Sequence, residues 1–255
     1  MDNLDDILND FQSKFGIKPK KPKELEVIQT GYKTIDTALG IGGIPIGKTT
    51  EISGEAGSGK TLLAYQLIAQ AQKNGLIVLY IDTERNFSRD FAKKVGVNLE
   101  ELVICTPVVG EMALQVIGYY AEHGYVDMVI LDSLPALIAT SELHTKLETA
   151  GNYEVQTRML GLLLQYVMDF IEEKAITFVA INQIRTDVKT HKIITPFNKL
   201  MSYYASVRMQ LSRVKSIRKN RKILGYKVEA NIFKNNYSKR DIADFDLIIR
   251  GEQNG

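Results

Sequence analysis

The chain has 255 residues, of which 45% are hydrophobic and 24% charged, a composition that supports a substantial buried core. Because 32 basic residues face 30 acidic ones, the formal charge of +2 argues neither for nor against a polyanionic partner. A single cysteine excludes a disulfide framework, and no apolar run approaches the roughly 20 residues of a membrane helix. The acidic start, MDNLDDILNDF, does not resemble a signal peptide, which makes the cytoplasm the expected compartment.

Residues 1–23 are predicted to form a short helix and a linker. Four apolar side chains recur at helical spacing and form one stripe: Leu4, Leu8, Phe11 and Phe15. Gly16 ends the pattern, and the following IKPKKPKE, rich in proline and lysine, predicts an extended tether. The stripe must be buried either against the core of the same chain or against a neighbouring subunit. The residues alone do not decide between these two alternatives.

From residue 24 onward, short β-branched segments alternate with helical ones, which is typical of an α/β fold with a parallel sheet covered by helices. The expected strands are residues 48–53, 76–82, 102–106, 126–132 and 176–182, and the expected helices are residues 61–75, 88–97, 111–124 and 155–174. Strand segments such as MVIL and FVAI are apolar throughout, which predicts burial on both faces. The β-rich segments after residue 203 have short connections, which predicts antiparallel strands at the sheet edge.

The stretch SGEAGSGKTL contains the pattern G-x-x-x-x-G-K-[ST] between a predicted strand and a predicted helix, the context that a phosphate-binding loop requires. The loop residues are Gly54, Glu55, Ala56, Gly57, Ser58, Gly59, Lys60 and Thr61. Its glycines let backbone N–H groups turn toward phosphate oxygens, while Lys60 neutralises the β- and γ-phosphates and Thr61 can ligate Mg²⁺. The sequence therefore predicts a P-loop that binds a nucleoside triphosphate.

Polar residues at the ends of other predicted strands could complete this site. Asp132, at the end of DMVILD, is placed to hold Mg²⁺ together with Thr61. Hydrolysis also requires a group that orients or deprotonates water, and LYIDTER offers Asp82 and Glu84, one of which can face the γ-phosphate. Gln183, at the end of FVAINQIR, is suited to sense a γ-phosphate through a hydrogen bond.

Taken together, the motifs resemble those of the bacterial and phage RecA recombinases. The resemblance rests on TGYKTIDTALGIGGIPIGKTTEISGEAGSGKT, YIDTER, VDMVILDSLPAL, INQIR and YYASVRMQLSRV, in this order, and extends from about residue 11 to about residue 252. It implies a P-loop ATPase core of the RecA type that uses ATP and Mg²⁺. It also implies filaments on single-stranded DNA, pairing with homologous duplex DNA, and an N-terminal helix that packs on the adjacent protomer.

The resemblance also implies roles for particular residues. Glu84 would activate the attacking water, and Gln183 would report the γ-phosphate to a DNA-binding loop. With Lys60 they form the implied catalytic set. Phe91 stands where the family stacks an aromatic ring on adenine, although a helix core position explains it almost as well. Lys234 would reach the nucleotide of the neighbouring subunit.

Two segments correspond to the DNA-binding loops of the family. The first candidate loop covers about residues 141–158 and includes Arg158; the second candidate loop covers about residues 185–199. The basic residues of the second are Arg185, Lys189, Lys192 and Lys199. Such polar, positive segments suit contact with a phosphate backbone. Residues 213–240 add ten basic residues and one acid, an excess that the near-neutral total conceals.

Some residues depart from the family pattern. The second candidate loop is shorter and lacks the family's paired glycines, Asn236 stands where a second lysine is usual, and Ser202 replaces another lysine. The chain ends where bacterial RecA carries a further domain, which indicates a compact phage-type recombinase.

The expected organisation is residues 1–23 for protomer packing and residues 24–255 for the ATPase core. The expected function is that of an ATP-dependent recombinase. The alternatives are a ring-forming RecA-fold ATPase of the helicase or clock type, and a DNA-binding mediator that does not hydrolyse ATP.

Overall fold

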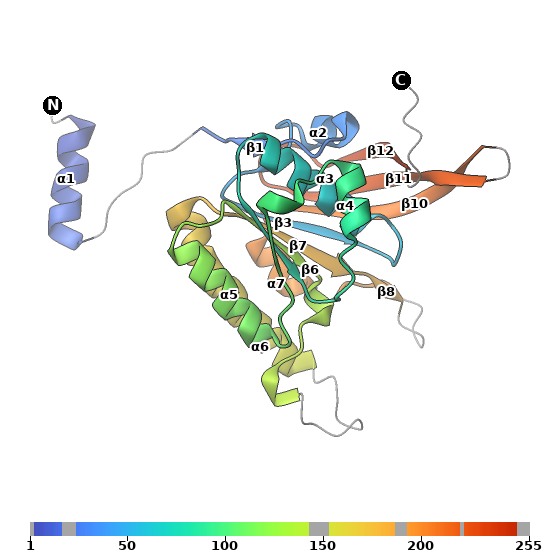
Figure 1. The fold of residues 1–255 in the computed structure, drawn as a ribbon. Coiled ribbons are helices and arrows are strands. Elements are labelled where there is room, and N and C mark those ends of the chain that lie inside the picture. Colours follow the sequence, from blue (N-terminus) through green and yellow to red (C-terminus); the bar gives the residue numbers. More distant parts are fainter. Residues whose placement is uncertain (1–2, 17–23, 143–152, 187–192, 220–221, 249–255) are drawn as a thin grey trace.

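The computed structural model describes residues 3–16, 24–142, 153–186, 193–219 and 222–248. At its centre lies an eight-stranded sheet in the order β12-β11-β10-β3-β7-β6-β4-β5 (Figure 1). The strands that run parallel are β3 (Thr49–Gly54), β4 (Val78–Asp82), β5 (Leu102–Cys105), β6 (Met128–Asp132), β7 (Thr177–Gln183) and β10 (Val207–Lys219). Antiparallel strands β11 (Lys222–Asn235) and β12 (Asp241–Ile248) complete the edge.

The α/β fold with a mostly parallel sheet and an antiparallel edge is thereby confirmed. One detail differs from the sequence expectation, because β10 is parallel to its neighbour β3 and the antiparallel part begins only at β11. The chain reaches β10 through a helix rather than a tight turn, and such crossovers return a strand in the same direction.

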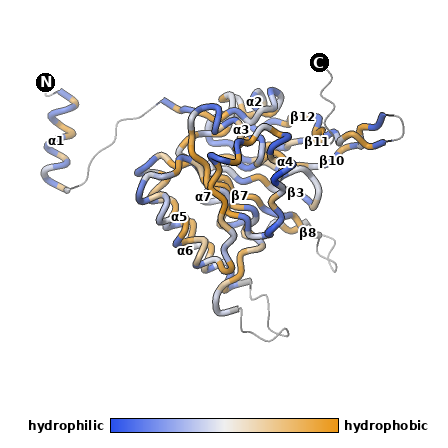
Figure 2. The backbone as a smooth tube through the Cα atoms, in the orientation of Figure 1, coloured by the Kyte–Doolittle hydropathy of each residue, from blue (hydrophilic) through white to orange (hydrophobic). Residues whose placement is uncertain are grey.

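Helices cover both faces of the sheet. On one face lie α2 (Lys33–Leu39), α3 (Lys60–Lys73) and α4 (Arg89–Val95), and on the other lie α5 (Gly110–Glu122), α6 (Tyr153–Lys174) and α7 (Asn198–Tyr204). Successive strand residues face opposite sides: Tyr80 joins the first core, whereas Leu79 and Ile81 join the second. Figure 2 shows the hydrophobic residues gathered on the central strands, as expected for a sheet buried on both faces.

Several short elements were not predicted from the sequence. They are α2 and α7, strands β1 (Val27–Ile28), β2 (Ile44–Pro45), β8 (Arg185–Thr186) and β9 (Ile193–Ile194), and the 3₁₀ turns η1 (Leu99–Glu101), η2 (Leu134–Ala136) and η3 (Thr140–Glu142). The pair β8 and β9 forms a two-stranded antiparallel sheet of its own.

The predicted N-terminal helix is present as α1 (Leu4–Phe15), and Gly16 ends it with φ 66°. Figure 1 shows α1 apart from the sheet, and none of its residues is buried. Leu4, Phe11 and Phe15 expose 57%, 42% and 57% of their surface, so this chain leaves most of the stripe uncovered. Among the helices within the described residues, none is both long and apolar enough to cross a membrane.

Candidate nucleotide site and its surroundings

The P-loop joins the end of β3 to the start of α3, as the motif predicts. Gly57 and Gly59 have φ 72° and 101°, a region that side-chain-bearing residues seldom adopt. A Cβ atom on Gly59 would also clash with Leu247 of β12, and one on Gly54 would lie 2.6 Å from the carbonyl oxygen of Leu211 in β10. The positive φ angles therefore require glycine at positions 57 and 59, and the backbone of β10 leaves no room for a side chain on Gly54.

Lys60 lies inside this loop. Its Nζ donates hydrogen bonds to the carbonyl oxygens of Gly54 at 3.0 Å and Glu55 at 2.8 Å, and its side chain is buried. Burial lowers the pKa of Lys60, while the charges of Asp132, Glu84 and Glu55 act in the opposite direction. The loop thus holds the lysine against its own backbone, and the contact of Lys60 with phosphates stays a prediction.

Asp132 and Thr61 come together although 71 positions separate them in the chain. The Thr61 hydroxyl donates to Asp132 Oδ2 at 2.9 Å, and the Tyr80 hydroxyl donates to the same oxygen at 2.7 Å. Burial raises the pKa of Asp132, and these two hydrogen bonds lower it. A hydroxyl and a carboxylate form the sparse oxygen set with which proteins hold Mg²⁺, so these residues fit that ion.

Glu84, just beyond β4, connects the site to β7. Gln183 donates its Nε2 hydrogen to Glu84 Oε1 at 2.6 Å, and Ser133 donates its hydroxyl hydrogen to the same oxygen. Asn86 donates to the other carboxylate oxygen at 3.0 Å. The candidate water-activating residue and the candidate γ-phosphate sensor are therefore in direct contact.

Asp82, the alternative to Glu84, has a different role. Its two carboxylate oxygens accept the backbone N–H groups of Asn86 and Phe87 at 3.2 and 3.0 Å. Asp82 is only 2% exposed, so its carboxylate fixes the turn after β4. This geometry favours Glu84 as the group that meets water.

The remaining predicted nucleotide contacts lie elsewhere. Phe91 in α4 is half-buried against the core, with its ring centroid 6.2 Å from that of Tyr65. Lys234 in β11 donates to the carbonyl oxygen of Ser202 at 2.8 Å, and burial together with the charge of Arg208 lowers its pKa. The predicted adenine contact and the predicted contact with a neighbouring subunit stay predictions.

The candidate DNA-binding residues within the described chain are exposed on three elements: Arg158 on α6, Arg185 on β8 and Lys199 on α7. Lys189, Lys192 and residues 143–152 of the first candidate loop lie outside the described residues. The start of the second candidate loop is tied to the P-loop, because Gly54 pairs with Gln183 and accepts the N–H of Ile184 at 3.0 Å.

Three residues of the site were not identified from the sequence. Tyr80 bonds to Asp132 and Ser133 to Glu84, as described above. Arg213 of β10 donates to the carbonyl oxygen of Gly57, with its guanidinium 3.6 Å from the ring centroid of Tyr226. The only sequence signal for Arg213 was its place in the basic stretch 213–240. Tyr80 gave no signal, because an aromatic residue is common in a buried strand.

Comparisons with known proteins agree with this geometry. The family model described as the RecA N-terminal domain matches residues 4–252. The chain is 36% identical to "Protein RecA" of Rickettsia canadensis over 229 residues, which cover 88% of this chain and 66% of that protein. It is also 36% identical over 239 residues to "Protein RecA" of Rickettsia bellii and of Rickettsia prowazekii, covering 92% of this chain and 69% of each relative. The chain thus spans about two thirds of the length of the curated relatives that it matches.

Proposed function

Because the chain belongs to the RecA family, we propose that it is a DNA-dependent ATPase that forms filaments on single-stranded DNA and promotes homologous pairing and strand exchange. The observation that carries the proposal is the contact of Glu84 with Gln183 at the end of β7. This strand pairs with the P-loop strand and continues into Arg185, so hydrolysis, γ-phosphate sensing and a candidate DNA loop share one set of contacts.

In the proposed mechanism, Lys60 exchanges the carbonyl oxygens of the P-loop for the β- and γ-phosphates of ATP. Thr61 and Asp132 hold Mg²⁺, which when bound neutralises charge that develops on the phosphates. Glu84 orients the attacking water and accepts its proton. Gln183 gives up its hydrogen bond to Glu84 and donates to the γ-phosphate instead, which shifts the start of the second candidate loop.

The proposed assembly uses two further features of the chain. The uncovered stripe of α1 packs on the adjacent protomer, and a contact between two different surfaces of this kind propagates as a filament. Lys234 then reaches the nucleotide of that neighbour, and Phe91 stacks on adenine within its own site. Homologous duplex DNA is the second substrate, after the single strand has been bound.

The test combines ATP hydrolysis with electron microscopy. We expect oligo(dT) to stimulate hydrolysis and ATP with oligo(dT) to produce helical filaments. Lys60→Ala, which removes the phosphate-facing charge, should abolish nucleotide binding and both effects while its circular dichroism spectrum stays unchanged. Closed rings that form equally well without DNA, or hydrolysis insensitive to DNA, would contradict the proposal.

A further inference from the structure

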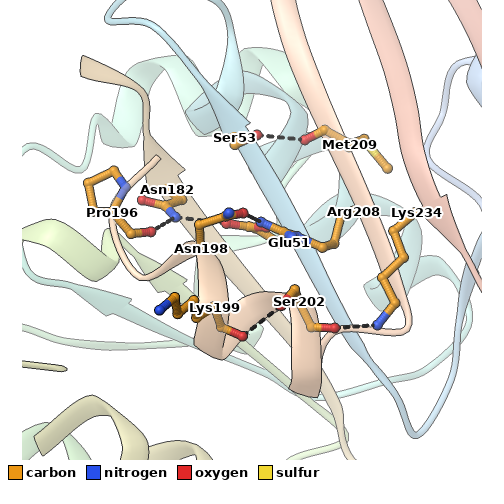
Figure 3. A network of polar contacts seen from close by, with 10 residues as sticks. All are labelled: Glu51, Ser53, Asn182, Pro196, Asn198, Lys199, Ser202, Arg208, Met209 and Lys234. Carbon is orange, nitrogen blue, oxygen red and sulfur yellow. Dashed lines mark hydrogen bonds and ion pairs between the residues drawn. The ribbon is translucent and has the colours of Figure 1, made fainter. Parts of the chain in front are cut away.

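A buried ion pair joins β10 to β3, the strand that leads into the P-loop (Figure 3). Glu51 in β3 has no exposed surface, and its carboxylate oxygen Oε2 accepts a hydrogen bond from Arg208 in β10, which is 4% exposed. The other oxygen, Oε1, accepts Asn182 Nδ2 of β7 at 2.7 Å. A carboxylate buried this completely requires a charged partner and hydrogen bonds, and here the two strands that flank β3 supply the arginine and one hydrogen bond to each carboxylate oxygen.

Both partners of Glu51 also contact the residues that precede and begin α7. Asn182 Nδ2 donates a second hydrogen bond to the carbonyl oxygen of Pro196 at 2.7 Å. Arg208 donates from Nη2 to Asn198 Oδ1 at 2.8 Å. Between these two anchored residues, Phe197 is 3% exposed and has φ 56°, so the backbone enters α7 in one fixed, sterically demanding conformation.

The far end of α7 is held by the same strand pair. Lys234, the cross-strand partner of Arg208, donates to the carbonyl oxygen of Ser202 at 2.8 Å (Figure 3). Strands β10 and β11 therefore fix both ends of the helix, which carries Lys199 on its exposed side.

This network also adjoins the nucleotide site at two points. Glu51 stands three residues before Gly54 on the same strand, and Asn182 directly precedes Gln183, which contacts Glu84. A displacement of α7 must therefore either break a hydrogen bond of a buried charge or move the strands that carry the P-loop and the γ-phosphate sensor.

We propose that Asn198 and Asn182 are positioning residues which, through the Glu51–Arg208 pair, couple DNA binding at α7 and Arg185 to nucleotide binding at the P-loop. This inference rests on the proposed function, because it names the residues through which the bound nucleotide and the bound DNA affect each other. Coupling of this kind is reciprocal, so the affinity for each ligand rises by the same factor when the other is bound.

Asn198 is the member of the network to vary. It is exposed, and removing its amide takes one acceptor from Arg208 but leaves the buried ion pair intact, whereas changes at Glu51 or Arg208 threaten folding. Asn198→Asp keeps an acceptor oxygen at the same place. Asn231→Ala removes another exposed asparagine amide, from β11, and is the matched control.

The experiment measures the affinity for labelled oligo(dT) with and without a non-hydrolysable ATP analogue and Mg²⁺. The ratio of the two dissociation constants is the coupling. We expect Asn198→Ala to reduce the coupling by about fivefold or more, within the usual range of such effects, while nucleotide affinity without DNA changes by less than about twofold. Asn198→Asp should restore the coupling, and Asn231→Ala should leave it unchanged.

Wild-type coupling in Asn198→Ala would overturn the inference. The inference would also be overturned if Asn198→Ala lost nucleotide affinity equally with and without DNA. That result would mean that Asn198 supports the nucleotide site alone. A wild-type protein that shows no coupling would instead contradict the proposed function, and with it the premise of this inference.

Discussion

Burial and hydrogen bonding shift the pKa of the Asp132 carboxyl group in opposite directions. Burial raises its pKa, and the hydroxyls of Tyr80 and Thr61 lower it. Because the net pKa in the folded protein lies above the usual value, this group stabilises the metal-free protein at low pH, and that contribution is lost as the pH rises through the folded pKa. If Asp132 holds Mg²⁺ as proposed, the ion requires the ionised carboxylate, so proton and metal would compete for the same oxygens.

Tyr80→Phe should therefore change the pH dependence of Mg²⁺-dependent nucleotide binding. Without the Tyr80 hydroxyl the pKa of Asp132 rises further, so affinity should begin to fall at a higher pH than in the wild-type protein. A titration of nucleotide affinity from about pH 8 to about pH 5, across the range in which raised carboxyl pKa values lie, measures this shift. An unchanged profile would mean that the Tyr80 hydroxyl does not affect this carboxylate.

Glu84→Gln should separate binding from turnover. The amide is close in size to the carboxylate and can still accept from Gln183 or Ser133, but it cannot take a proton from water. Hydrolysis should fall by about 10²-fold or more, the scale of a lost general base, while ATP-dependent assembly on DNA persists. Normal turnover in this variant would show that Asp82 or another group orients the water.

Sequence motifs singled out Lys60, Thr61 and Asp132, and the structure brings these three residues close together, while their roles stay predictions. Tyr80 was not identified because its partner, Asp132, is 52 positions away and three of the other four residues of its strand, VLYID, are aliphatic. The contact of Ser133 with Glu84 likewise depends on β6 lying beside β4, and strand order is a property of the folded sheet.

Within the part of the chain that the structure describes, α1 is an element whose apolar stripe is mostly uncovered. Phe11 and Phe15 contact each other, with ring centroids 4.8 Å apart, yet both remain exposed. Short isolated helices are marginal in water, so the stripe requires a partner to be stable. The division into residues 1–23 and a core from residue 24 stays a prediction.

Deleting residues 1–15 should leave a folded monomer that binds ATP but forms no long filaments. The free energy of unfolding should hardly change, because α1 buries none of its residues in this chain. Denaturant unfolding and electron microscopy of the truncated protein test the two parts separately. A truncated protein that unfolds or aggregates would show that the helix packs on its own core.

The length of an element did not decide whether the sequence predicted it, because the seven-residue α4 was expected within residues 88–97 and the seven-residue α7 was not. The continuous apolar run MVIL predicted a buried strand, the helical period of residues 155–174 predicted a helix, and both elements are present. The residues of α7 gave no such signal, although this helix supports the inferred coupling network. Its position depends on Arg208 and Asn182, which only the folded sheet brings together.

The whole molecule combines near neutrality with an uneven distribution of charge. The net charge is +2, yet Arg185 and Lys199 are exposed on elements adjoining β7, and residues 213–240 are strongly basic. If a phosphate backbone contacts the exposed residues near β7, their removal must weaken binding to all DNA sequences alike, since phosphates carry no sequence information.

Arg185→Ala combined with Lys199→Ala should therefore flatten the salt dependence of binding to oligo(dT). Each lost phosphate contact on a single strand lowers the slope of log affinity against log salt concentration by about 0.7, so two contacts correspond to about 1.4. Nucleotide affinity without DNA should stay unchanged, while stimulation of hydrolysis by DNA falls, because Arg185 lies two residues beyond Gln183 and Lys199 lies on α7. Lys93→Ala with Lys94→Ala, which removes two exposed charges from α4 on the other face of the sheet, should keep the wild-type slope. If the two double variants behave alike, the DNA site lies elsewhere, and the basic residues of 213–240 become the next candidates.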